Sequence, residues 1–194
     1  ARGAAGFHTI SKSDTKAIER QFPKHPVVQV PNRFDATGYA GKAAGNICPV
    51  TFDKSRFNIL WAGRLTEQKG IGHLLDIINS LNPELSNKVD WHLCGDGELR
   101  GMLEQEARRW NNIHIHGHID RMAMPVVYAN ANLFISTSQW GETFAYTPRE
   151  ANSLGLPVVA FNISGYNEII EHGVNGLLAK SVGEFGEQVR FFAK

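Results

Sequence analysis

The chain has 194 residues, of which 42% are hydrophobic and 20% charged, as is usual for a globular domain. Its formal net charge of +1 argues against nucleic-acid binding through a broad basic patch, so we expect no nucleic-acid partner. No apolar run approaches the roughly 20 residues that span a bilayer. Two cysteines, Cys48 and Cys94, are too few for a disulfide framework, which favours a reduced, cytoplasmic location.

Residues 1–50 are rich in Gly, Ala and Pro and differ in character from the rest of the chain. They contain one short helical pattern after Ser11 or Ser13 and one short strand, PVVQV, followed by turn formers. We expect this segment to be a remnant of a preceding domain and an interdomain linker, outside the core of the domain over 51–194. The last residues read as a helix that has barely begun, so we expect that domain to be truncated at its C-terminal end.

From residue 57 onward, short apolar strands alternate with amphipathic helices, the first of which repeats Ile71, Leu74, Leu75 and Ile78 at helical spacing. This alternation predicts an α/β fold, a Rossmann-like parallel sheet with helices on both faces. Ligands of such sheets bind outside the carboxyl ends of the strands. The six expected strands are FNILWAG, VDWHLCG, NIHIHG, NLFISTS, PVVAF and VNGLLAK, with later helices expected over Leu99 to Trp110, Met122 to Ala129, Pro148 to Leu154, within GYNEIIEHG, and from Gly183.

The loop after the first of these strands, GRLTEQKG, carries two cations, Arg64 and Lys69. Lys69 directly precedes the following helix, whose free N–H groups and positive dipole end favour an anion. A guanidinium and an ammonium beside such a helix suit a diphosphate. The alternative is that both are solvated surface cations.

The loop after the fourth strand, QWGETFAY, carries Glu142, and Glu150 lies in the first turn of the next helix. Local sequence gives Glu150 a structural alternative, because TPRE fits a capping box in which Thr147 is the helix cap. The same carboxylate could instead accept hydrogen bonds from ribose hydroxyls. Backbone N–H groups of residues 144–146 could meet phosphate or sugar oxygens.

Four segments resemble the retaining glycosyltransferases of family four, which have the two-domain GT-B fold. In chain order, they are similar to that family's GRL…KG loop, its G-D-G-x-x-x-x-L turn, its paired-glutamate motif with seven residues between the glutamates, and its G-x-x-E-I-I-x-x-G-x-x-G-x-L run. They occur in the family's order over residues 57–180. The matching segments of this chain are GRLTEQKG, CGDGELRGML, GETFAYTPREANSLGLPVVAF and GYNEIIEHGVNGLL.

The resemblance implies a donor-binding, C-terminal half of an enzyme that moves a sugar from a nucleoside-diphosphate sugar to an acceptor hydroxyl, without a metal or other cofactor. It leaves the catalytic group unassigned and makes Glu142 the best candidate for contact with the transferred sugar. The acceptor (a sugar, a lipid-linked sugar or another hydroxyl compound) would be held by the missing domain, so the fragment alone is expected to be inactive. Peripheral membrane association of the full-length enzyme would fit such a role. The implied donor contacts are Arg64 and Lys69 to the diphosphate, Glu150 to the ribose, Glu142 to the sugar, the backbone of Phe144, Ala145 and Tyr146 to the sugar and distal phosphate, and the loop at His118 and Ile119 to the base.

The chain departs from the family pattern in two places. Ala145 stands where the family often has the second glycine of E-G-F-G, and an alanine forced to positive φ would cost roughly 1 kcal/mol. PNRFD at residues 31–35 replaces the more usual P-N-G-V-D. The first departure concerns the geometry beside the sugar.

Other functions have weaker support. His114, His116 and His118 alternate along a strand and are expected on one face, but no Cys or carboxylate cluster accompanies them, which argues against a metal site. No Asp-x-Asp pair occurs, the GDG turn lacks the dinucleotide fingerprint, and no G-x-S-x-G elbow is present. The alternative that stays open is a non-catalytic nucleotide-binding module.

Overall fold

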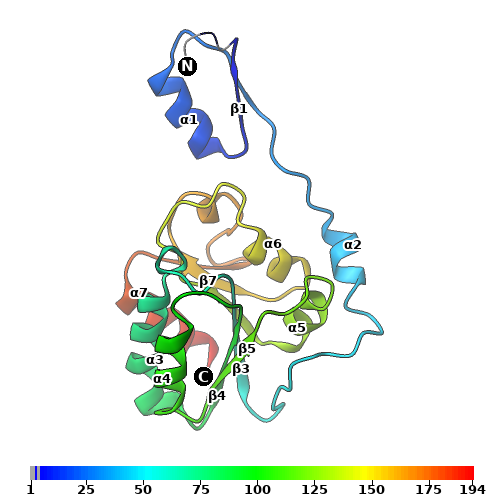
Figure 1. Ribbon diagram of the computed structural model, residues 1–194, viewed down its shortest axis with the longest axis vertical. Helices are drawn as coiled ribbons and strands as arrows, with labels where there is room; N and C mark the ends of the chain where they lie inside the picture. Colours follow the sequence, from blue (N-terminus) through cyan, green and yellow to red (C-terminus); the bar gives the residue numbers. More distant parts are fainter. Residues whose placement is uncertain (1–2, 4) are drawn as a thin grey trace.

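The computed structural model describes Gly3 and residues 5–194, and it has an extended shape in which a small N-terminal unit stands above a larger α/β domain (Figure 1). The domain is built on a six-stranded sheet with the order β5-β4-β3-β6-β7-β8. Every neighbouring pair is parallel, which confirms the predicted fold class. The strands are β3 (Phe57–Ala62), β4 (Val89–Cys94), β5 (Ile113–Gly117), β6 (Leu133–Ser136), β7 (Val158–Phe161) and β8 (Gly176–Ala179).

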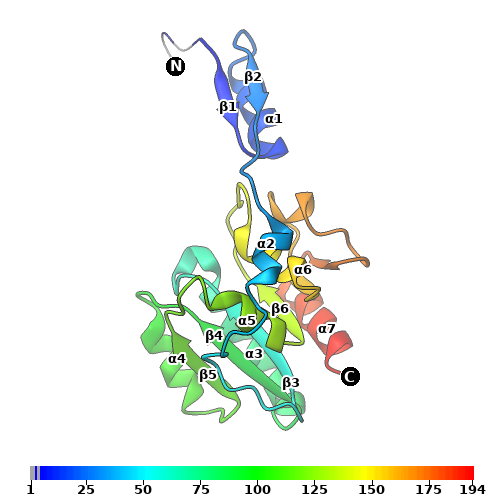
Figure 2. The ribbon, with the colours of Figure 1, turned by 90° about the vertical axis from the view of Figure 1, so that its right-hand side faces the viewer.

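Helices cover both faces of this sheet, because alternate residues of the central strands are apolar on each side (Figure 2). One face packs Ile59 and Trp91 against α3 (Ile71–Leu85), α4 (Arg100–Ala107) and α7 (Val182–Phe192). The other packs Leu60 and Phe134 against α5 (Met124–Asn130) and α6 (Tyr146–Ser153). No helix of the described residues is long and apolar enough to cross a membrane.

Two predicted helices differ from those observed. The segment GYNEIIEHG forms only a 3-10 turn, η2 (Tyr166–Glu168), because Gly165 before it has φ 88° and the chain leaves helical geometry at Ile169. The helix expected from Leu99 to Trp110 ends at Ala107, so Trp110 packs from the turn that follows.

The N-terminal unit consists of β1 (Phe7–Thr9), α1 (Lys12–Gln21) and β2 (Val27–Gln29), and its two strands pair in parallel outside the main sheet. Ser11 is the cap of α1, accepting a hydrogen bond from the N–H of Asp14 at 3.0 Å. β1 was not predicted, since three residues give too little periodicity.

The sequence predicts that residues 1–50 lie outside the core of the domain. In the structure, part of this segment belongs to the core. A short helix, α2 (Ala36–Gly41), lies against α6 (Figure 2), and Tyr39 and Val50 are buried in the same apolar cluster as Leu60. Its pattern is hard to recognise in the sequence because four of its six residues are Gly or Ala and only Tyr39 is a large apolar side chain.

Hydrogen bonds join the N-terminal unit to the domain at the loop between β7 and β8. The carboxylate of Glu168 accepts from the backbone N–H groups of Lys12 at 3.0 Å and Ser13 at 3.2 Å, in the first turn of α1. The hydroxyls of Ser13 and Ser164 are also hydrogen-bonded. A carboxylate at this end of a helix is favoured by the unused N–H groups and the helix dipole.

Candidate functional site

Every sequence-predicted site residue lies at the carboxyl edge of the sheet. The loop after β3 ends in a 3-10 turn, η1 (Glu67–Lys69), and Gly70 then starts α3 with φ 71°. A Cβ at Gly70 would come within 1.8 Å of the carbonyl oxygen of Thr137, so only glycine lets this loop approach the loop after β6. This close approach brings Lys69 to Glu142.

Lys69 and Glu142 form an ion pair between these two loops, with side chains 29% and 23% exposed. The hydroxyl of Ser138 lies 3.0 Å from Glu142 Oε1 and 3.1 Å from the carbonyl oxygen of Gln68, and it can donate to either. The cation expected at the phosphates and the carboxylate expected at the sugar are therefore in direct contact.

The backbone of Glu142 is held from its other side. Its N–H donates to the carbonyl oxygen of Ser164 at 2.9 Å. Gly165, at φ 88°, approaches so closely that a Cβ there would lie 1.6 Å from the carbonyl oxygen of Glu142. The carboxylate is thus presented by a loop that two glycine-dependent contacts fix in place.

Ala145 is the cap residue of α6 and has φ 52° and ψ 63°. No other non-glycine residue in the described part of the chain has a positive φ. The substitution of alanine for the family's glycine thus falls on a left-handed position, where L-residues are strained. Arg149 supports the loop, because its Nε donates to the carbonyl oxygen of Phe144 at 2.8 Å and its guanidinium lies over the ring of Phe144.

The capping-box alternative for Glu150 is wrong. Because Ala145 is the cap, Thr147 lies inside the helix, and no side chain caps α6. Glu150 instead points inward, where it accepts a hydrogen bond from the hydroxyl of Tyr128 at 3.2 Å. Within the described residues, the N–H groups of Tyr146 and Thr147 at the start of α6 have neither a helical partner nor a capping side chain, so they are free for an anion.

Glu150 is almost fully buried, with 8% of its side chain exposed. Burial raises the pKa of Glu150, while the Tyr128 hydroxyl and the Arg121 guanidinium, whose Nη2 lies 3.9 Å from Glu150 Oε1, act in the opposite direction. The charge of a carboxylate in such surroundings is stabilised when hydroxyl groups of a ligand donate hydrogen bonds to it.

The predicted residues line two neighbouring hollows rather than one. A cavity of about 340 Å³ is lined by Arg64, Ile119 and Glu150, with His118 at its side. A smaller one of about 180 Å³ is lined by Lys69, by Glu142 and by residues 144–146, whose backbone N–H groups are expected to contact the donor. Thr147 lines both. Arg64 and Lys69, expected at one diphosphate, therefore line different hollows, which meet at Thr147 at the start of α6.

Sequence reasoning missed two residues of the larger hollow, Arg121 and Tyr128. Arg121 is 74% exposed and lies over the ring of Tyr146 at 5.9 Å, so it adds a second guanidinium to the one that Arg64 provides. Its position in the loop after β5, at the carboxyl edge of the sheet, could have identified Arg121 from the sequence as a candidate site residue. Tyr128 lies on α5 and is fully buried, so its pattern resembles that of a core residue.

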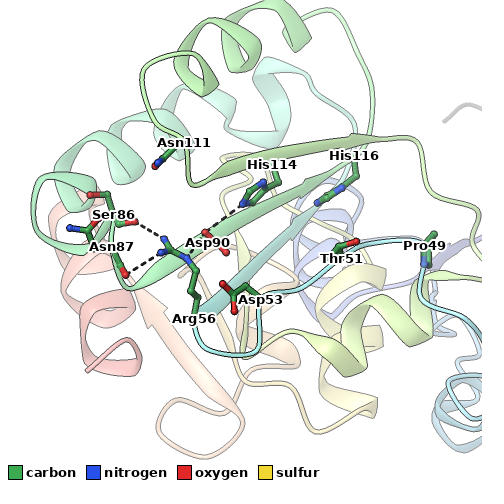
Figure 3. A pocket seen from close by; sticks show the side chains of 10 residues that line it. All are labelled: Pro49, Thr51, Asp53, Arg56, Ser86, Asn87, Asp90, Asn111, His114 and His116. Carbon is green, nitrogen blue, oxygen red and sulfur yellow. Dashed lines mark hydrogen bonds and ion pairs between the residues drawn. The ribbon is translucent and has the colours of Figure 1, made fainter.

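A further cavity, of about 560 Å³, lies elsewhere, around the amino ends of β3 and β4. In Figure 3, Arg56 lies beside Asp90, its Nε donating to Oδ1 at 2.7 Å, and donates also to backbone carbonyls. The cations and carboxylates expected to hold a donor do not line it. Its lining residues are Pro49, Thr51, Asp53, Arg56, Ser86, Asn87, Asp90, Asn111, His114 and His116.

The histidines of β5 do not share one face as a set of three. His114 and His116 stack with His92 of β4. His118 instead lies beyond Gly117, whose φ of 69° ends the alternation, and it lines the larger of the two hollows described above. Burial, with smaller effects of His114 and His116, lowers the pKa of His92 to about 3. No group of three or more His, Cys, Asp or Glu side chains among the described residues is placed to hold a metal ion.

The whole domain has the fold of known sugar transferases. The model of the family described as "Glycosyl transferases group 1" matches residues 49–192. An uncharacterized 41.2 kDa protein of the cps region of Klebsiella pneumoniae is 29% identical over 125 residues, which are 64% of this chain and 33% of that protein. The chain spans about a third of the length of the curated relatives it matches.

Solved structures of glycosyltransferases contain a domain with the same fold as this chain. TarM of S. aureus, in a complex with UDP, matches 100% of this chain and 38% of its own with a TM-score of 0.81 at 20% identity. Anabaena HepE with UDP matches 98% and 54% with a TM-score of 0.76 at 23% identity. At these identities the likeness shows the fold, half of a GT-B architecture. With its family model matched from before β3 to the end of α7, the chain belongs to the group 1 glycosyltransferases.

Proposed function

We propose that this chain is the C-terminal, donor-binding domain of a retaining glycosyltransferase of family four, which moves a hexose-type sugar from a nucleoside-diphosphate sugar to an acceptor hydroxyl. The observation that carries the proposal is the pair of hollows at the start of α6. Each combines a cation with a carboxylate, and the two meet at Thr147. The retaining outcome and the C-terminal position rest on the motif resemblance.

The charges of the two hollows suit the parts of such a donor. Arg64 and Lys69, with Arg121 as a third cation, would surround a diphosphate that also meets the free N–H groups of α6. Glu150 would accept from the ribose hydroxyls, and the base would lie against Ile119. Glu142 would receive the sugar hydroxyls once Lys69 turns from the carboxylate to the phosphate.

Catalysis in this scheme is electrostatic. As the sugar leaves, negative charge develops on the diphosphate, and cations and N–H groups that are already in place stabilise it without reorganising. We propose that no metal is needed, because fixed cations carry out the charge neutralisation. The chain spans about a third of its relatives' length, so we propose that the acceptor groups lie in a second domain and that this chain alone binds a donor and transfers its sugar poorly.

Calorimetric titration with UDP, GDP and ADP, in the presence of a chelator, tests this proposal. We expect saturable binding of at least one of them to the chain, and no binding of any would contradict the donor-site assignment. The parent gene separates the two functional classes: an upstream α/β domain of similar size supports transfer, and its absence favours a non-catalytic nucleotide-binding module. For the full-length enzyme we propose a cytoplasmic location, with peripheral contact to the inner face of the membrane.

A further inference from the structure

A third hollow at the carboxyl edge, of about 360 Å³, shares no lining residue with the two donor hollows. It is formed by the same loop after β3, by the loop after β4 and by the loop after β6. Neither the motif resemblance nor the donor assignment gives it a role. Its lining residues are Thr66, Glu67, Gln68, Glu98, Gln139 and Trp140.

The backbone under this hollow is fixed by contacts between the three loops. The N–H of Leu65 donates to the carbonyl oxygen of Asp96 at 2.9 Å, and that of Leu99 donates to the carbonyl oxygen of Leu65 at 3.0 Å. The N–H of Gln139 donates to the carbonyl oxygen of Gln68 at 3.3 Å. The hollow therefore has walls that are already in place before a ligand arrives.

Trp140 is the most unusual residue of the hollow, because it is 64% exposed. The other three tryptophans donate their indole N–H to Thr137, Asn82 and Asn79. The indole N–H of Trp140 has no acceptor among the described residues. A large aromatic face and a free donor are thus presented together to a ligand.

The polar groups around Trp140 are also unused. Glu67 and Glu98 form no ion pair with any described residue, and the buried hydroxyl of Thr66 has no hydrogen-bond partner in the described chain. Gln68 and Gln139 add amide groups that both donate and accept. The site offers carboxylate acceptors, amides and a hydroxyl beside an aromatic face, and it has no cation among its lining residues.

This combination fits a neutral sugar unit. The C–H face of a sugar ring is apolar and stacks on an aromatic ring, while its hydroxyls donate to carboxylates and exchange hydrogen bonds with amides. Two unpaired carboxylates repel a phosphate or an acidic sugar, so the hollow is chemically opposite to the donor site. The hollow therefore favours a neutral sugar over a nucleotide.

We propose that this hollow is a carbohydrate subsite that holds a neutral sugar unit of the acceptor, a proposal that rests on the transferase function proposed above. Trp140 lies only two residues before Glu142, so their Cα atoms are at most about 7 Å apart. A sugar stacked on Trp140 would therefore lie next to the place where the donor sugar is held. This half of the enzyme contributes to acceptor choice as well as to donor binding.

The test is an NMR titration of the ¹⁵N-labelled chain with maltose, N,N′-diacetylchitobiose, glucose 6-phosphate and ethanolamine. The indole signal of Trp140, assigned as the one absent from Trp140→Phe, reports on the hollow. We expect saturable shifts of this signal with at least one neutral disaccharide, and none with glucose 6-phosphate over the same concentrations. Trp140→Ala should weaken disaccharide binding about tenfold or more, monitored on the side-chain amide of Gln139, whereas the matched control Trp110→Phe should leave it unchanged.

A double variant, Glu67→Gln with Glu98→Gln, should admit glucose 6-phosphate while keeping the fold, because the negative charges are removed and the amide oxygens can still accept from sugar hydroxyls. Binding of ethanolamine alone would show a cation site and overturn the proposal, as would the absence of saturable shifts with both disaccharides. UDP, GDP and ADP are titrated separately and read on the amides of Ala145 and Thr147. No response to any of the three nucleotides, with an intact sugar response, contradicts the donor assignment only, and a nucleotide response without a sugar response contradicts the subsite only.

Discussion

At the scale of single residues, the loop that presents Glu142 ends on a strained alanine. Ala145 has φ 52°, a conformation that costs an L-residue about 1–2 kcal/mol. Ala145→Gly should therefore raise the free energy of unfolding by about 0.5–1 kcal/mol, once the extra freedom of glycine in the unfolded chain is subtracted. Urea unfolding measures this change.

Ala107→Gly is the matched control, since Ala107 ends the ordinary helix α4. There the same substitution should lower stability by about 0.5–1 kcal/mol. If both variants lose stability, Ala145 is not strained in solution.

Arg64 tests the phosphate assignment. It lines the larger hollow without an ion-pair partner among the described residues, so its guanidinium is available to a ligand. Arg64→Ala should weaken UDP binding about 10- to 100-fold and uridine binding hardly at all, because a charge-assisted hydrogen bond contributes about 1.5–3 kcal/mol. Arg109→Ala, which removes an exposed cation from the turn after α4, serves as the control in the same calorimetric titrations. Equal losses for UDP and uridine would place Arg64 away from the phosphates.

Glu150 separates binding from stability. Because burial raises its pKa, the folded state binds a proton at this carboxyl more tightly than the unfolded chain does, and the ionised form opposes folding. Glu150→Gln should thus keep or raise the melting temperature while it weakens UDP binding, whereas Glu104→Gln, at an exposed position, should change neither. A lower melting temperature with unchanged affinity would assign Glu150 a structural role.

At the scale of elements, β4 and β5 carry a pH-dependent feature in the stacked histidines. His92 has a pKa of about 3 in the fold against about 6.5 in an unfolded chain. Because the pKa of His92 is lowered in the fold, neutral His92 contributes its full share to the free energy of unfolding above pH 6.5. This contribution is lost as the pH falls from 6.5 towards 3, at about 1.4 kcal/mol per pH unit. His92→Gln should have lower stability at neutral pH and a shallower loss between pH 6.5 and 4.

Urea unfolding at several pH values measures these slopes. His73→Gln, at a half-buried site on α3, should keep the slope of the unaltered chain. Parallel slopes for His92→Gln and the unaltered chain would show that another group causes the acid sensitivity.

The order of elements could be predicted because each strand and helix carries its own periodicity, as the run from Ile71 to Ile78 shows. What the sequence left open depends on contacts between distant segments. Nothing near Thr147 reveals that Ala145 caps α6, since the loop geometry is set by Ser164 and Gly165, about twenty residues away. The separation of Arg64 and Lys69 into two hollows likewise follows from where α6 begins.

At the scale of the whole molecule, the boundary of the domain lies earlier than residue 51. Tyr39 and Val50 are buried against the sheet, whereas residues 7–29 form a separate unit. A chain over 33–194 should therefore unfold with nearly the same midpoint as the whole chain. A chain over 51–194 should lose about 2–5 kcal/mol, because two large apolar side chains leave a core. Thermal and urea unfolding of both would test this, and equal stability of the two truncated chains would contradict it.

The contacts of Glu168 have a mechanical consequence. The N-terminal unit meets the loop between β7 and β8 through hydrogen bonds that water can replace, while α2 stays attached by buried apolar packing. Because water can replace these polar contacts, we expect them to give way before the apolar packing of α2 does, and residues 30–35 join the two parts. Ser164, which bonds Ser13 through its hydroxyl, also accepts a hydrogen bond from the N–H of Glu142. The same residue therefore links the N-terminal unit to the loop that carries this carboxylate.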